Sequence, residues 1–172
     1  MFKLEEQFEG LQMRLTAYTD YALRVLMYVG LKSRELVRID EVAASFGISR
    51  NHLSKIVHHL GSMGYLQTVQ GRNGGFQLAC DAAEITVGQV VRDFEPDFNL
   101  VECFDSTQSK CRIQPSCVLA GELDKALAAF LGRLDRVTLR DLVAPRHRLQ
   151  AQLGLPRTRT PLATGTNRLA RT

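Results

Sequence analysis

The stretch from Arg38 to Gly64 constrains the fold most, because it combines two short helical patterns with a glycine turn. The first helix is expected to begin near Asp40, and Ser49 is a suitable N-cap for the second. Gly47 lies between them and can adopt the left-handed conformation that a tight turn requires. Apolar residues at helical spacing give each helix an inward face, namely Val42, Ala43, Phe46, Leu53, Ile56, Val57 and Leu60. Two short helices around such a turn predict a helix-turn-helix.

Two short strands are predicted directly after this unit, within residues 65–80. The loop between them contains Asn73-Gly74, which is a strong hairpin signal. A helix-turn-helix that is followed by a β-hairpin forms a winged helix. Further helical patterns lie on either side of it, at residues 15–29 and 87–94.

A longer helix is predicted over residues 116–137, where apolar residues recur at steps of 4, 3, 4, 4 and 3. These residues are Leu119, Leu123, Ala126, Phe130, Leu134 and Val137. They form a stripe close to a heptad pattern over about three heptads. One such helix cannot bury its stripe against so small a domain, so we expect a homodimer. The expected fold class is mainly α with a small β-hairpin: a winged helix-turn-helix plus a long C-terminal dimerisation helix.

Charge is distributed unevenly and supports a division of the chain into parts. Residues 14–80 carry eight Lys and Arg against four acids, whereas residues 81–145 carry seven against eleven. The chain from Arg146 onward has six arginines and no acid. A basic front half suits a polyanionic partner. We expect four parts: an N-terminal extension (1–12), a winged helix-turn-helix DNA-binding domain (13–80), a cysteine-bearing sensor loop with the dimerisation helix (81–144), and a basic, disordered tail (145–172).

No part of the sequence is typical of a membrane protein, an exported protein or an enzyme. A run of about 18 apolar residues is absent, which excludes a membrane-spanning helix. The first residues are acidic and contain no apolar stretch, so we expect a cytoplasmic protein. The sequence contains no acid/base pair, nucleophile elbow or phosphate-binding loop, so an enzyme is not expected.

Three cysteines, Cys103, Cys111 and Cys117, lie within fifteen residues of one another. In a reducing cytoplasm, thiols this close together favour a metal site over disulfides. Structural zinc sites usually contain paired cysteines two to four residues apart, a spacing that is absent here. Three irregularly spaced thiolates fit an iron–sulfur cluster better, and they leave a fourth ligand to be found. Cys80, near the end of the second strand, is expected to be a small buried residue rather than a ligand.

Polar side chains on the outward face of the second helix are candidate DNA contacts. Asn and Arg suit the edges of adenine and guanine in a major groove, whereas Lys and His suit phosphates. The hairpin tip is a second candidate, for the minor groove or the DNA backbone. The candidate residues are Ser49, Arg50, Asn51, His52, Lys55, Arg72, Asn73, Gly74 and Gly75. His58 and His59, at the far end of the same helix, are expected to be surface or partly packed residues.

Several motifs together resemble the NsrR-type nitric-oxide-sensitive repressors of the bacterial winged-helix family with iron–sulfur sensors. They occupy residues 13–24, 49–56, 71–75, 101–104 and 111–117, and the resemblance covers about residues 13–144. It implies a homodimeric repressor on a palindromic operator in double-stranded DNA, with the second helix in the major groove and the wing in the minor groove. It also implies that nitrosylation of the cluster by nitric oxide, the signal, releases the DNA.

The same resemblance implies a ligand set. Cys103, Cys111 and Cys117 would hold the cluster, with 4Fe-4S expected rather than 2Fe-2S, and Asp20 of the partner subunit would be the fourth ligand. Asp20 also has an ordinary structural interpretation, since an acid in the first turn of a helix is favoured by the helix dipole. The chain departs from the pattern in the long gap between the first two cysteines, and in Ala120, where relatives that regulate cluster assembly have a ligating histidine.

Two alternatives stay open from the sequence. Within the regulators, the chain fits an iron- or redox-sensing iron–sulfur repressor of iron metabolism. From a different class, it fits a zinc-stabilised interaction module.

Overall fold

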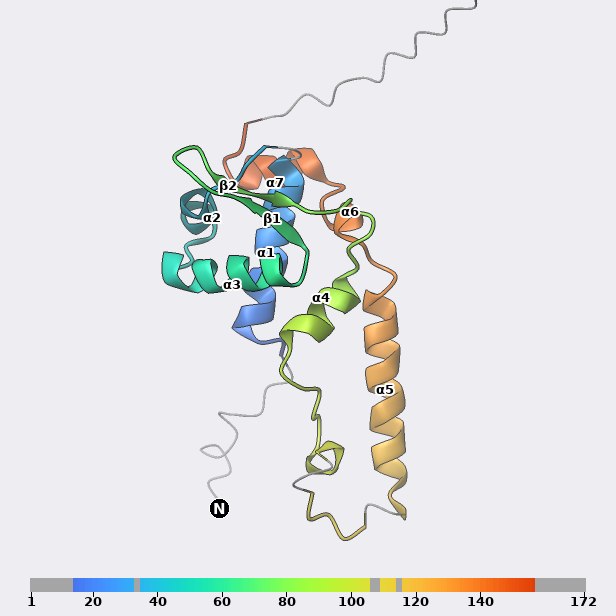
Figure 1. Cartoon of the computed structure of the whole chain (residues 1–172). Coiled ribbons are helices and arrows are strands. Elements are labelled where there is room, and N and C mark those ends of the chain that lie inside the picture. The colour runs from blue at the N-terminus through green and yellow to red at the C-terminus, as the bar shows by residue number, and fades with distance from the viewer. Residues whose placement is uncertain (1–13, 33–34, 106–108, 114–115, 157–172) are drawn as a thin grey trace, which may run out of the picture.

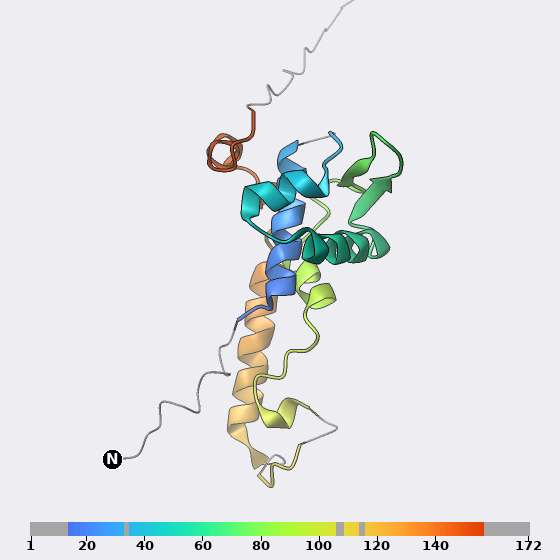
Figure 2. The ribbon, with the colours of Figure 1, turned by 90° about the vertical axis from the view of Figure 1, so that its left-hand side faces the viewer.

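A buried helix, α1 (Ala17–Lys32), runs through the winged part of the molecule, and the other elements pack around it (Figures 1 and 2). The structure is a computed structural model that describes residues 14–32, 35–105, 109–113 and 116–156. The elements after α1 are α2 (Ile39–Phe46), α3 (Arg50–Ser62), β1 (Leu66–Val69), β2 (Gly75–Leu78), α4 (Val87–Phe94), the 3-10 turn η1 (Glu102–Phe104), α5 (Val118–Leu134), α6 (Leu139–Leu142) and α7 (Arg146–Gln152). This order confirms the predicted winged helix followed by a long helix.

The helix-turn-helix has the predicted turn and caps. Gly47 ends α2 in the left-handed conformation, with φ of 66°, and its N–H donates to the Ala43 carbonyl at 2.9 Å. The Ser49 hydroxyl accepts from the His52 N–H at 3.3 Å and so caps α3. The first helix begins slightly earlier than predicted, because Arg38 is its N-cap and Asp40 lies in its first turn. These local signals fix the angle at which α3 leaves the turn.

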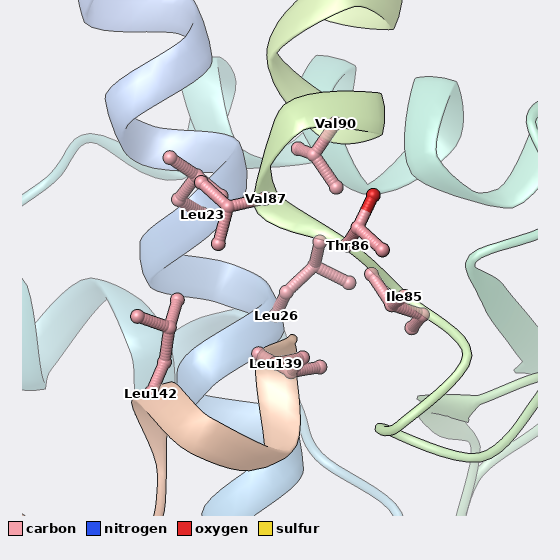
Figure 3. A pocket seen from close by; sticks show the side chains of 8 residues that line it. All are labelled: Leu23, Leu26, Ile85, Thr86, Val87, Val90, Leu139 and Leu142. Carbon is pink, nitrogen blue, oxygen red and sulfur yellow. The ribbon is translucent and has the colours of Figure 1, made fainter. Parts of the chain in front are cut away.

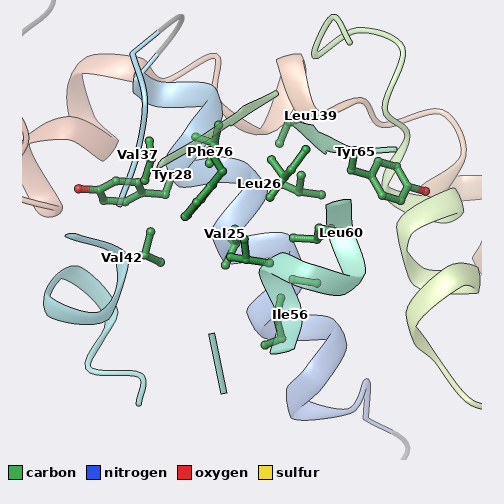
Figure 4. Close-up of a cluster of buried hydrophobic side chains, with 14 of the residues drawn as sticks. Val25, Leu26, Tyr28, Val37, Val42, Ile56, Leu60, Tyr65, Phe76 and Leu139 are labelled. Carbon is green, nitrogen blue, oxygen red and sulfur yellow. The ribbon is translucent and has the colours of Figure 1, made fainter. Parts of the chain in front are cut away.

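The wing is a two-stranded antiparallel hairpin that a third segment joins. Leu66 pairs with Leu78 at its base, and Val69 pairs with Gly75 near its tip. The backbones of Val37 and Phe76 exchange two hydrogen bonds of 2.9 Å, which attach the segment before α2 to the hairpin. Figure 4 shows the core beneath it, where side chains from α1, α3, β2 and the residue before β1 meet, among them Val25, Leu26, Tyr28, Ile56, Leu60, Tyr65 and Phe76.

The helices α4, α5 and α6 connect the winged part, formed by α1 to β2, to the cysteine segment, which contains Cys103, Cys111 and Cys117. Figure 1 and Figure 2 both show α5 extending away from the winged part, next to the chain that follows α4. Arg92 on α4 holds Asp135, at the end of α5, through two hydrogen bonds of 2.6 and 2.7 Å. Between α1, α4 and α6 lies an apolar seam with no room for a water molecule, shown in Figure 3 and lined by Leu23, Leu26, Ile85, Thr86, Val87, Val90, Leu139 and Leu142.

The prediction of a disordered tail from residue 145 onward is wrong for Arg146–Gln152, which form α7. This helix packs back against α1, its Leu149 contacts the core, and Gln150 is only 1% exposed. The Arg146 guanidinium donates to the carbonyl of Leu31 in the last turn of α1. Tertiary contacts therefore order a segment whose composition alone is typical of a solvated tail. The remaining tail from residue 157 and the N-terminal extension 1–12 lie outside the described residues.

Within the described ranges, no helix has both the length and the apolar character that crossing a membrane requires.

Candidate nucleic-acid interface and metal centre

The outer face of α3 is polar and accessible because its apolar residues all point into the core. Leu53 and Ile56 are fully buried, and Leu60 is buried with them. The predicted contact residues occupy the opposite face, and Ser49, Arg50, Asn51, His52 and Lys55 are all exposed. The N-terminal half of α3 thus presents hydrogen-bonding side chains to solvent, and these remain the candidate contacts for a groove of DNA.

Arg50 is held in place by its neighbour in the helix-turn-helix. Its Nε lies 2.8 Å from a carboxylate oxygen of Asp40 on α2, and the Arg50 side chain is 71% exposed. An exposed ion pair of this kind contributes little to stability. It does orient the guanidinium at the edge of the polar face.

The wing tip presents its side chains to solvent on a tightly closed backbone. Arg72 and Asn73 are exposed. A Cβ on Gly74 would collide with the carbonyl oxygen of Val69 and lie 2.9 Å from that of Gly71. A Cβ on Gly75 would lie 2.6 Å from the carbonyl oxygen of Val37. The two glycines therefore act through the shape of the wing, whereas Arg72 and Asn73 are its candidate contacts.

The segment between α4 and α5, which carries the three clustered cysteines, lies at the far end of the molecule from the wing (Figure 1). Cys103 lies in η1, Cys111 follows in the loop, and Cys117 is the N-cap of α5. All three are half-buried, and none of the four cysteines forms a disulfide. In the described part of the chain, no three His, Cys, Asp or Glu side chains converge closely enough to hold a metal ion. The structure thus places the three thiols on one segment without gathering them around a common point.

The donor set itself fits a soft metal or an iron–sulfur group. Three thiols share a short polar segment, and Cys117 stands at the positive end of the α5 dipole, which favours an anionic ligand there. Asp20 lies in the first turn of α1, is 45% exposed, and forms an ion pair of 2.8 Å with Arg24. It makes no metal-binding group with the cysteines of its own chain among the described residues.

Cys80 is exposed, so the expectation of a small buried residue is wrong. The strand β2 ends at Leu78, two residues earlier, and the chain at Cys80 has already left the hairpin. Although the residue is exposed, neighbouring atoms exclude some water from its sulfur, and this desolvation, together with the nearby Glu84 and Asp81, raises the pKa of the Cys80 thiol. A thiol that resists deprotonation is a poor metal ligand. Cys80 is therefore a suitable control residue for the clustered cysteines.

The structure adds one connection that no sequence pattern indicates. The Glu95 carboxylate, directly after α4, accepts hydrogen bonds from the N–H of Thr16 at 2.8 Å and from its hydroxyl at 3.2 Å. This ties the start of α1 to the chain that leads into the cysteine segment. The two residues are 79 positions apart, so only the folded chain reveals the pair.

Comparisons with known proteins identify the family of this chain. The Rrf2 family, described as iron-dependent transcriptional regulators, matches residues 15–145. The HTH-type transcriptional regulator NsrR of Bacillus subtilis (strain 168) is 48% identical over 132 residues, which cover 76% of this chain and 90% of that protein. The HTH-type transcriptional regulator NsrR of Geobacillus kaustophilus (strain HTA426) is 49% identical over 142 residues, which cover 82% and 97%.

Solved structures share the fold. IscR of T. potens superposes with a TM-score of 0.63 at 21% identity, covering 82% of this chain and 92% of that one. The oxidized form of Staphylococcus aureus CymR gives 0.61 at 23% identity, with 76% and 95% covered. This chain therefore belongs to the Rrf2 family of iron-dependent transcriptional regulators and, as its sequence predicts, it is a regulator rather than an enzyme.

Proposed function

We propose that this protein is a cytoplasmic, homodimeric, DNA-binding repressor whose iron–sulfur cluster senses nitric oxide. Cys103, Cys111 and Cys117 of one chain and Asp20 of the partner chain would hold the cluster. The observation that carries the proposal is the position of the cysteine segment. It lies between α4, which packs on the winged part, and α5, which is left uncovered in the single chain. Nitric oxide as the signal follows from the resemblance to nitric-oxide-sensitive repressors and fits the relatives named NsrR.

The dimer is supported by the exposure of α5. Although the helix carries a stripe of apolar residues, none of its residues is buried in the single chain. Leu119 is 62% exposed and Phe130 is 47% exposed. A heptad-like stripe of this kind is typically covered by a second helix. Pairing α5 with its copy would bury the stripe and place two α3 helices for successive major grooves, about 34 Å apart.

The proposed role of Asp20 is supported by its accessibility. Its carboxylate is half exposed, and its ion pair with Arg24 is a surface contact that costs little to break. An iron–sulfur cluster, when bound, supplies iron that reacts with nitric oxide. The change in the protein itself is proposed to begin at Asp20. Asp20 either faces the partner's cysteine segment or turns back to Arg24, and this choice sets the position of the first turn of α1. The result is a two-position element that ligation can bias.

The test is titration with nitric oxide of protein purified without oxygen, followed by a DNA shift assay. The probe is a duplex that the loaded protein itself selects from a random pool. We expect cluster absorbance and DNA affinity to fall together. Unchanged affinity after complete reaction with nitric oxide would contradict the proposal.

A pair of cysteine variants tests the ligand assignment. Cys111→Ala is expected to lose most of its bound iron and sulfide, because it removes one of three thiolates. Cys80→Ala is the matched control and should keep the wild-type content, since that thiol lies outside the segment. Both contents are measured on protein prepared without oxygen. Equal iron in the two variants would remove Cys111 from the ligand set.

Iron sensing is the second candidate, and the description of the family as iron-dependent favours it. The two candidates differ in the stimulus that releases DNA. If iron is the signal, a chelator releases DNA at lower doses than nitric oxide does. If nitric oxide is the signal, stoichiometric nitric oxide releases DNA while the chelator acts slowly or not at all.

A further inference from the structure

Three aromatic rings meet where α1, α3 and α4 come together. Tyr18 lies in the first turn of α1, His59 in the last turn of α3, and Phe94 is the last residue of α4. The His59 and Phe94 ring centroids are 4.4 Å apart. Tyr18 stacks on Phe94 at 5.6 Å and lies 5.8 Å from His59. We call these three residues the aromatic junction.

The junction is joined to α3, the proposed recognition helix, by hydrogen bonds as well as by packing. The Tyr18 hydroxyl donates to the backbone carbonyl of Lys55 at 3.4 Å and lies 3.3 Å from Nδ1 of His59. Lys55 is one of the exposed residues on the proposed DNA face. Tyr18 therefore contacts the backbone of α3 directly beneath a candidate phosphate contact.

The junction is also linked to the proposed sensor, through Asp20 on α1 and through the chain that follows α4. Asp20 follows Tyr18 by two residues on α1. On the α4 side, Phe94 is only 5% exposed, and the next residue, Glu95, holds the start of α1 through its two hydrogen bonds with Thr16. The chain then runs without another α-helix through η1, which contains Cys103. Asp20 is thus two residues from one ring of the junction, and the chain that leads to Cys103 begins directly after another.

A second contact keeps α4 attached to the winged part. The Tyr65 hydroxyl, just before β1, donates to the carboxylate of Asp93. Burial and this hydrogen bond raise the pKa of Tyr65, so it remains a donor at neutral pH. This contact fixes α4 one residue before Phe94. A shift of the chain that follows α4 is therefore expected to move the ring of Phe94. Packed interfaces of this kind change between discrete arrangements rather than deforming smoothly.

We infer that the aromatic junction positions the recognition helix and transmits the ligation state of the sensor segment to it. The inference rests on the proposed function and names the residues through which that site controls DNA binding. Tyr18 is the central positioning residue of the three. Its ring and its hydroxyl both contact α3, and it lies in the same turn of α1 as Asp20. Its hydroxyl links the sensor side to the backbone of α3, and its ring maintains the stack with Phe94.

The test compares DNA affinity before and after nitric oxide, and expresses the result as the ratio of the two. In Tyr18→Phe the ring remains and the link to Lys55 is lost. We expect wild-type iron content and wild-type stoichiometry with nitric oxide, but a ratio reduced by about fivefold, as the loss of one hydrogen bond allows. A purely structural role would lower both affinities equally and leave the ratio unchanged. Tyr28→Phe, near the other end of α1, is the matched control and should keep the wild-type ratio.

His59→Leu is the second variant, because it removes the hydrogen-bond partner on α3 and keeps an apolar contact with Phe94. His59 lies on α3, on the other side of the junction from the cysteines. The iron content of the variant should therefore be unchanged, and its ratio of DNA affinities before and after nitric oxide should fall. An unchanged ratio in both variants overturns the inference and leaves the proposed function intact. Loss of iron from either variant also overturns it, since the junction would then build the site rather than transmit from it. A wild-type ratio of one contradicts the proposed function itself.

Discussion

Gly74 determines the shape of the wing, because the hairpin backbone closes around the position where a side chain would stand. A Cβ there would meet the carbonyl oxygens of Val69 and Gly71, and backbone atoms cannot rotate away as a flexible side chain can. We predict that Gly74→Ala lowers the free energy of unfolding by roughly 1–3 kcal/mol. It should also weaken DNA binding, since the tip that carries Arg72 and Asn73 is displaced.

Gly121 on α5 provides the control for that substitution. A Cβ at Gly121 would meet nothing within 4 Å, and the residue lies inside a helix. Gly121→Ala should therefore raise stability, by about 0.5–1 kcal/mol. Both variants are measured by urea denaturation and by a DNA shift assay. Equal stability of Gly74→Ala and wild type would show that the hairpin can open at no cost.

Asp135 makes stability depend on pH in acid. Its hydrogen bonds with Arg92 hold the pKa of that carboxyl below its ordinary value. A carboxyl with a lowered folded-state pKa stabilises the fold above its unfolded pKa, and the effect is lost as the pH falls through the folded value. We predict that Asp135→Asn is less stable than wild type at pH 7, and that the difference shrinks between about pH 5 and pH 3. Urea midpoints at several pH values measure it, and a difference independent of pH would exclude the ion pair as its source.

At the scale of elements, cap and turn residues predicted the structures that depend on their nearest neighbours in the chain. Ser49, Gly47 and Asn73 fix caps and turns through interactions with their nearest neighbours, so the helix-turn-helix and hairpin followed from the sequence. The helix α7 did not, because long-range contacts stabilise it and its composition suggests a solvated tail. The pair Glu95 and Thr16 was missed for the same reason. The three cysteines were predicted to share one site, and the described part of the chain does not gather them around a common point.

The helix α7 should contribute measurably to stability even though it follows the segment that matches the family. Its Leu149 packs on the core, Gln150 is buried, and Arg146 bonds to the end of α1. We predict that a chain ended after residue 145 loses about 2–3 kcal/mol of unfolding free energy. A chain ended after residue 156 retains α7 and is the control. Equal thermal midpoints for the two chains would show that α7 packs without stabilising.

At the scale of the whole molecule, the proposed site would join two distant parts of the structure through a second copy of the chain. The proposed fourth ligand, Asp20, lies in the first turn of α1, whereas the cysteines belong to the segment between α4 and α5, at the other end of the structure from the wing (Figure 1). The helix α5, with its uncovered apolar stripe, is the element that would join two chains so that each completes the other's site. Dimerisation, cluster retention and DNA binding should therefore fail together.

Phe130→Glu tests this dependence, because it places a charge on the stripe where an exposed aromatic ring now stands. An unpaired charge in an apolar helix interface is strongly unfavourable, so we predict a monomer in sedimentation experiments. The variant should retain its winged-helix spectrum, lose most of its iron, and bind operator DNA at least tenfold more weakly, since one recognition helix replaces two. Ala128→Glu carries the same charge on the opposite, exposed side of α5 and should remain a loaded dimer. A monomeric Phe130→Glu protein that still holds its full iron would show that one chain completes the site alone, and Asp20 of the partner would no longer be required.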